Sequence, residues 1–234
     1  QALVLALLLD RHDAELRRQQ LAYLDRQAAG PVAVLTGRLA SSAIALPIEH
    51  RLPLLDLALP SLTRLHPRVQ DQLQVHVDDL VQADGRLDLF EWALRQVIWR
   101  HLVLGNQPAR WVNRKPRRVQ AVGGSLELLL SVLAHVGGRS DDAEAAFAAG
   151  RAKLPESLAV GLLPREGMSI ARLTDAVDEL AGVRPADQRS VIAACAAVIA
   201  ADGHVTARES ELMRAVAETL GLPLPPLLAG QKLI

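Results

Sequence analysis

This chain of 234 residues is poor in aromatic side chains, which make up only 3% of it. Half of the residues are hydrophobic, and Leu, Ala and Val supply most of them. The scarcity of Tyr, Phe and Thr disfavours β-sheets, because aromatic and β-branched residues are the ones that strands prefer. A core of aliphatic side chains is typical of packed helices, and the chain is long enough to bury one. We therefore predict an all-α fold.

The chain also lacks an excess of either charge, with 26 basic and 26 acidic residues. No overall field would attract nucleic acid or an acidic substrate, so a nucleic-acid partner is not expected. Cys195 is the only cysteine, which excludes an internal disulfide and fits a reducing compartment. Because no basic residue lies near it in its apolar stretch, we predict that Cys195 is a core residue and not a nucleophile.

Catalytic and membrane-spanning motifs are absent as well. The seven histidines include no pair four residues apart, so the His-Glu-x-x-His motif of zinc peptidases is missing. The longest apolar runs, Ala2–Leu9 and Val191–Ala201, stop at an aspartate and are shorter than the roughly 20 residues of a spanning helix. No basic region precedes the first run, as a signal peptide would require. Because the sequence begins at Gln1 inside a helical pattern, we expect it to be a piece of a longer protein.

What the chain does contain is one eight-residue signature in two copies, Asp84–Glu91 and Asp202–Glu209. Each copy has Asp-Gly, an aliphatic residue two positions after the Gly, and a Glu seven positions after the Asp. Apolar positions at helical spacing flank both copies and coincide when the copies are aligned. They are Leu73, Val77, Leu80, Val81, Leu94, Ile98 and Leu102 in the first copy, and Val191, Cys195, Val198, Ile199, Leu212, Val216 and Leu220 in the second. We predict two duplicated helix-turn-helix hairpins packed about a pseudo-two-fold axis.

Prolines and glycines suggest how the rest is organised. Residues 1–60 are predicted to form an N-terminal helical segment, interrupted at Pro47, Pro53 and Pro60. Residues 61–234 form the domain that carries the signatures, with a variable middle at 103–184 that contains two further helices. Pro67 and Pro185 are expected to open helices, where a missing N–H costs nothing.

A structural role explains every residue of the signature. Gly85 and Gly203 can adopt the left-handed conformation that ends a helix. Asp84 and Asp202 can accept N–H bonds within the turn. Asp88 with Glu91, and Thr206 with Glu209, have the three-residue spacing of a capping box.

A divalent-cation site is the alternative interpretation. The signature overlaps the second half of a calcium-binding EF-hand loop, with Asp at position 5, Gly at 6 and Glu at 12. The earlier ligand positions are apolar or neutral in both copies, so neither loop would bind calcium alone. If the two loops converge, then one ion could be shared by Asp84, Glu91, Asp202 and Glu209.

A basic segment that contains one tryptophan is the last candidate site. It consists of Arg110, Trp111, Arg114, Lys115, Arg117 and Arg118. A solvated loop explains it, and contact with anionic lipid headgroups is the better of its functional interpretations.

The paired Asp-Gly-x-aliphatic-x-x-x-Glu turns, over residues 67–102 and 185–220, resemble those of TerB-like domains. These are all-helical modules linked to tellurite resistance and also found attached to membrane proteins. The resemblance implies an all-α binding module. If the signature residues bind a divalent cation, then the module would be a metal-binding or metal-responsive one.

Three apolar stretches resemble the C-terminal region of HtpX-like bacterial membrane zinc metallopeptidases. They are Ala2–Asp10, Leu52–Pro60 and Leu220–Leu228. This resemblance implies a non-catalytic accessory or regulatory domain at the cytoplasmic face of the inner membrane, which docks a protein partner or the membrane surface. Zinc and the catalytic residues would lie upstream of Gln1. The sequence predicts no oligomeric state.

Overall fold

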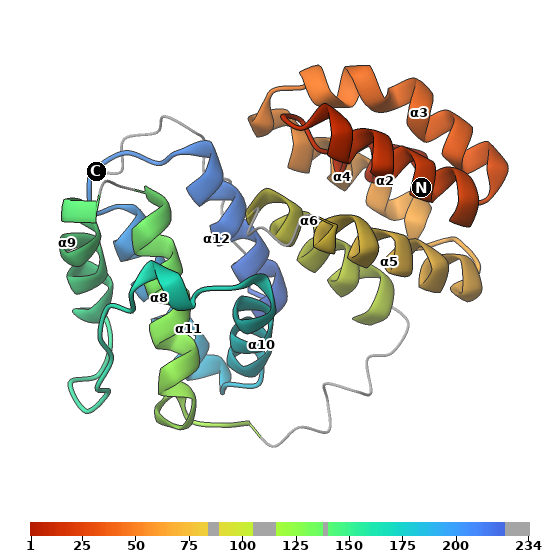
Figure 1. Cartoon of the computed structure of the whole chain (residues 1–234). Helices are drawn as coiled ribbons and strands as arrows, with labels where there is room; N and C mark the ends of the chain where they lie inside the picture. Colours follow the sequence, from red (N-terminus) through yellow and green to blue (C-terminus); the bar gives the residue numbers. More distant parts are fainter. Residues whose placement is uncertain (84–88, 105–115, 138–139, 223–234) are drawn as a thin grey trace. The chain divides into compact units, whose positions relative to one another are not determined.

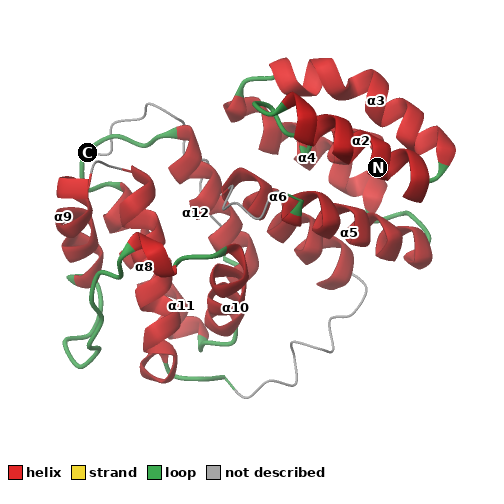
Figure 2. Cartoon of the chain, in the orientation of Figure 1, coloured by secondary structure: helices red, strands yellow, loops and turns green. Residues whose placement is uncertain are grey.

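The computed structural model describes residues 1–83, 89–104, 116–137 and 140–222. Over these residues the chain forms eleven α-helices and no strand, which confirms the all-α fold (Figure 2). An isolated parallel bridge joins Arg117 to Val183.

The chain divides into two compact units, Gln1–Gln107 and Pro108–Ile234 (Figure 1). The boundary predicted at residue 60 falls inside the first unit. The two copies of the signature belong to different units, so neither unit contains both hairpins.

The first unit is built around α1 (Ala2–Leu7), which contacts α3 (Gly30–Ala45), α4 (Ile48–Leu62) and α5 (Pro67–Gln82). Residues 4–9 are at most 1% exposed, because a helix that is apolar on all sides must be covered on all sides. α2 (Ala14–Gln27) packs on α3. α6 (Leu89–Trp99) packs on α4 and α5. It continues into the π-helical turn η1 (Arg100–Leu104).

Of the three predicted interruptions in the leucine-rich segment, only the one at Pro47 is confirmed, because Pro47 is the N-cap of α4 and separates it from α3. Pro53 and Pro60 lie inside α4, so the interruptions predicted there are wrong. Each proline removes one backbone hydrogen bond and strains the preceding turn. Burial of Leu52, Leu55 and Leu59 on one face of the helix offsets that loss.

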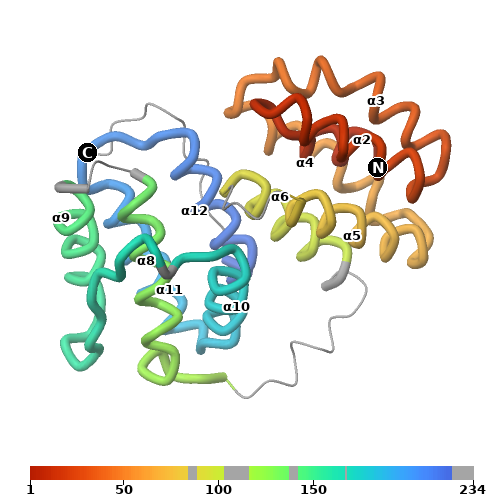
Figure 3. Tube along the Cα trace, viewed as in Figure 1, coloured from red at the N-terminus to blue at the C-terminus, as the bar shows by residue number. Residues whose placement is uncertain are grey.

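The second unit is arranged around α8 (Gly123–Gly137), whose neighbours α9 to α12 all pack against it (Figure 3). They are α9 (Ser140–Arg151), α10 (Ile170–Ala181), α11 (Pro185–Ile199) and α12 (Ala207–Leu220). Two 3-10 turns, η2 (Val119–Val122) and η3 (Arg165–Gly167), complete the unit.

Two features of the second unit differ from the sequence-based expectations. The sequence did not predict α10, although Leu173, Ala176, Val177 and Leu180 form a buried stripe at helical spacing. By length and composition alone, Val119–Val136 could cross a membrane, and 56% of this stretch is buried inside the protein. Such burial is also what the central helix of a packed unit shows.

Each copy of the duplicated pattern forms a helical hairpin, α5 with α6 and α11 with α12. The apolar positions aligned between the copies are all at most 5% exposed, which confirms the predicted core faces. Pro67 and Pro185 are the first residues of α5 and α11, as predicted.

Candidate functional site

The second signature forms the turn between α11 and α12. Gly203 has φ +77°, a left-handed conformation that costs glycine nothing. The Oδ1 atom of Asp202 accepts a hydrogen bond from the backbone N–H of His204 at 2.9 Å. Val205 is 2% exposed and attaches the turn to the core. The turn is thus held by local bonds and by one apolar contact.

Thr206 and Glu209 form a reciprocal capping box at the start of α12. The Oε2 atom of Glu209 accepts hydrogen bonds from the backbone N–H and the hydroxyl of Thr206, both at 2.7 Å. The Thr206 hydroxyl accepts one from the N–H of Glu209 at 3.2 Å. These bonds satisfy backbone donors that the helix leaves free and fix the Glu209 side chain in one orientation.

The first signature falls largely outside the described residues, which do not include Asp84, Gly85 and Asp88. Glu91 lies in the first turn of α6, in the other compact unit from Asp202 and Glu209. The predicted sharing of one ion by Asp84, Glu91, Asp202 and Glu209 therefore stays a prediction.

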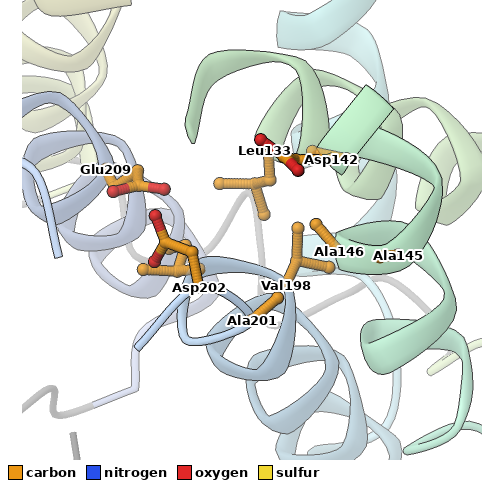
Figure 4. Close-up of a pocket in the computed structure, with 10 residues that line it drawn as sticks. Leu133, Asp142, Ala145, Ala146, Val198, Ala201, Asp202 and Glu209 are labelled. Carbon is orange, nitrogen blue, oxygen red and sulfur yellow. The ribbon is translucent and has the colours of Figure 1, made fainter. Parts of the chain in front are cut away.

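A cavity of about 410 Å³ opens beside the second signature, inside the second unit (Figure 4). Apolar side chains of α8, α9 and α11 form its walls, and three acidic residues lie at its edge. The lining residues are Leu133, Ala134, Asp142, Ala145, Ala146, Val198, Ile199, Ala201, Asp202 and Glu209. Figure 4 shows the carboxylate of Asp202 turned toward that of Glu209. The cavity therefore combines apolar walls with a negatively charged edge.

The three acidic residues differ in burial. Asp142 and Asp202 are exposed, whereas Glu209 is only 2% exposed. Among the described side chains, no Lys, Arg or His forms an ion pair with any of the three. Because Oε2 of Glu209 is engaged by Thr206, its Oε1 atom is left without a hydrogen bond from the described residues. This carboxylate is thus largely buried and held in one orientation by Thr206 and the first turn of α12, and it has no cationic side-chain partner among the described residues.

Sequence reasoning did not identify Asp142 as part of this site. It lies on α9, 60 residues before Asp202, and it reaches the cavity only because α8, α9 and α11 pack together. Within the described ranges, no group of three or more His, Cys, Asp or Glu residues is placed to hold a metal ion.

Cys195 is fully buried in α11, and burial raises the pKa of its thiol to about 12. A thiol that stays protonated at neutral pH is a poor nucleophile. The prediction of a core cysteine is confirmed.

A polar cluster that the sequence did not suggest lies between α2 and α5. The hydroxyl of Tyr23 donates to Oδ2 of Asp79 and lies 3.2 Å from Nδ1 of His76. Burial, and then the hydrogen bond and charge of Asp79, raise the pKa of Tyr23 to about 12. Burial lowers the pKa of His76, against the opposing charge of Asp79. These contacts join α2 to α5.

The basic segment is described only at its end, which leaves out Arg110, Trp111, Arg114 and Lys115. Arg117 is exposed, and its guanidinium Nη1 atom lies 3.6 Å from the carboxylate Oε1 atom of Glu179. Its backbone forms the isolated β-bridge to Val183. Arg118 is exposed and precedes η2.

Comparison with protein families matches residues 131–224 to the family described as "Tellurite resistance protein TerB". The chain therefore contains a TerB domain, which covers α9 to α12 and includes every residue that lines the cavity. The match confirms the predicted TerB-like character of the second hairpin. Comparisons with curated proteins and with solved structures give no match.

Proposed function

We propose that this chain is a non-catalytic interaction module, and that its TerB domain binds a partner at the acidic cavity. The observation that supports this is Glu209, a carboxylate that is 2% exposed, lines an open cavity and has no cationic partner among the described residues. The capping box already stabilises this carboxylate, but no cationic side chain neutralises it, so it can accept a cationic group that enters the cavity. Such a module acts through binding free energy and breaks no bond.

Photo-crosslinking in living cells tests this proposal. A photoreactive amino acid replaces Ala145, an exposed residue of the cavity wall, and in a matched control it replaces Ala171, an exposed residue of α10. We expect a protein adduct from position 145 that position 171 does not give. Equal labelling from both positions, or from neither, would contradict a docking site at the cavity.

A divalent-cation module that uses the signature carboxylates is the second candidate, because two of them, Asp202 and Glu209, line one cavity and hard cations prefer carboxylate oxygen. Its test is calorimetry of Ca²⁺, Mg²⁺, Mn²⁺ and Zn²⁺ with the metal-stripped chain. Saturable binding that Asp202→Asn and Glu209→Gln both abolish would favour the metal module. No heat at millimolar ion would eliminate it.

We also propose that the module belongs to an HtpX-like membrane zinc metallopeptidase and lies at the cytoplasmic face of the bacterial inner membrane. The support is the resemblance of the apolar stretches at 2–10, 52–60 and 220–228. In such a parent, zinc and the catalytic residues lie upstream, and the basic segment at 110–118 lies near an anionic leaflet. The upstream coding sequence tests this directly. Without a His-Glu-x-x-His motif there, the parent is wrong and the interaction module is unaffected.

A further inference from the structure

We propose that the partner places a basic side chain, arginine or lysine, in the acidic cavity, from a segment whose neighbouring residues are aliphatic. This inference rests on the proposed interaction function and specifies the chemistry of the partner. Three features of the cavity support it: its charge, its apolar walls and the fixed position of Glu209.

The charge of the cavity is the first feature. Asp202 and Glu209 face one another and Asp142 lies on the neighbouring helix α9, so the carboxylates present acceptors from two sides (Figure 4). No described Lys, Arg or His side chain neutralises them. A guanidinium or ammonium group would donate to the Oε1 atom of Glu209, which has no hydrogen bond from the described residues. Charge-assisted bonds of this kind are among the strongest that proteins form.

The walls of the cavity are the second feature. Leu133, Ala146 and Val198 contribute apolar surface between the carboxylates. Arginine and lysine carry a charged head on a methylene stem, and the stem lies well against apolar surface. The volume of about 410 Å³ is that of a small organic ligand site and leaves room for a side chain with its flanking atoms. A bare ion would leave these walls in contact with water.

The fixed position of Glu209 is the third feature. Its Oε2 atom is held by two hydrogen bonds from Thr206, so the carboxylate is oriented before any ligand arrives. Binding to an oriented group loses less side-chain entropy than binding to a mobile one. The capping box therefore both starts α12 and prepares the site.

The probes for the test are three capped tripeptides. Two are acetyl-Leu-Arg-Leu-amide and acetyl-Leu-Lys-Leu-amide, and the third carries citrulline, which has the shape of arginine without its charge. Each is titrated into the ¹⁵N-labelled full chain while backbone amide shifts are followed. We expect saturable shifts at residues 133–134, 142–146 and 198–209 with the two basic peptides. The citrulline peptide should bind at least about tenfold more weakly, because it lacks the charged donor.

Variants of the chain make the test specific. Asp202→Asn and Glu209→Gln should each lower the affinity of the chain for the arginine peptide by about tenfold, since each removes one charged acceptor. Glutamine also serves at the third position of a capping box, so Glu209→Gln retains the start of α12. Asp175→Asn removes an exposed carboxylate of α10 in the same unit and should leave the affinity unchanged. Circular dichroism spectra of the three variants are compared with that of the wild type, and we expect all of them to show the same helix content.

Several results would overturn the inference. Equal affinity for the arginine and citrulline peptides would show that charge is not recognised, and shifts confined to residues outside the cavity would place the basic residue elsewhere. Displacement of the peptide by micromolar Ca²⁺ would assign the cavity to a metal. If no peptide binds while position 145 still crosslinks a partner, then the basic side chain is wrong and the interaction module stands. If position 145 gives no specific adduct, then the proposed function itself fails.

Discussion

Glu209 accepts two hydrogen bonds from Thr206, from its backbone N–H and from its hydroxyl, both at 2.7 Å. The same two residues thus start α12 and orient the most buried carboxylate of the cavity. This relationship predicts that stability and ligand binding can be separated by mutation.

Thr206→Ala removes the capping hydroxyl and should lower the free energy of unfolding by about 0.5–2 kcal/mol. Glu209→Gln should cost less, because the glutamine amide oxygen can replace Oε2 as the acceptor. Urea unfolding followed by circular dichroism measures the free energy of unfolding of both variants. An unchanged midpoint for Thr206→Ala would show that the box adds no stability.

Gly203→Val should destabilise the second unit by more than about 1 kcal/mol, because a β-branched residue is disfavoured at φ +77°. Gly124→Ala in α8 is the matched control, since a Cβ there meets nothing within 4 Å. Gly124→Ala should leave the free energy of unfolding unchanged or raise it slightly. Thermal melts compare the two, and equal melting temperatures would contradict the left-handed turn. The same substitution at Gly85, which lies outside the described residues, addresses the first copy of the signature.

Gly150→Ala tests the close approach of α9 to α11 behind the cavity. A Cβ on Gly150 would overlap Cγ2 of Val198 and lie 2.9 Å from the backbone oxygen of Ala194. Because the backbone of α11 cannot yield cheaply, we expect a loss of about 1–3 kcal/mol in the free energy of unfolding. Since Val198 lines the cavity, the amide shifts of α11 should change as well. Stability equal to the wild type would mean that the two helices separate readily.

His76 should make the first unit less stable in mild acid. Burial lowers its pKa below the ordinary value of 6.5, although the charge of Asp79 opposes the shift. Between the folded and the unfolded pKa the unfolded chain binds more protons, so stability falls as the pH drops below about 6.5. Melting temperatures at about pH 7.5 and about pH 5.5 should differ less in His76→Gln than in the wild type. His12→Gln, which removes an exposed imidazole, is the control and should keep the wild-type difference.

Much of the local structure could be predicted from neighbouring residues. Pro67 and Pro185 begin helices as predicted, and Gly221 ends α12 at φ +69°, the left-handed conformation that glycine adopts readily. The prolines inside α4 show the limit of such reasoning. Local rules predict breaks there, but burial of leucines on one face of the helix outweighs the lost hydrogen bonds.

The candidate site could be predicted only in part. Asp202 and Glu209 belong to the repeated signature and were identified from it. Asp142 has no sequence feature that distinguishes it from other exposed acidic residues, and it becomes a candidate through the packing of α9 against α8 and α11. The contact of Tyr23 with His76 and Asp79 was missed for the same reason, since 53 residues separate Tyr23 from His76.

The sequence by itself determined that the chain is helical, that α5 and α11 begin at Pro67 and Pro185, and that Asp202–Glu209 forms a capped turn. These properties depend on spacings of three to eight residues, over which backbone geometry acts directly. Only the tertiary structure decided that the two signatures lie in separate units, that Glu209 is buried, and that three carboxylates share one cavity with apolar walls. Those properties depend on how distant helices pack, and short sequence patterns do not specify which faces meet.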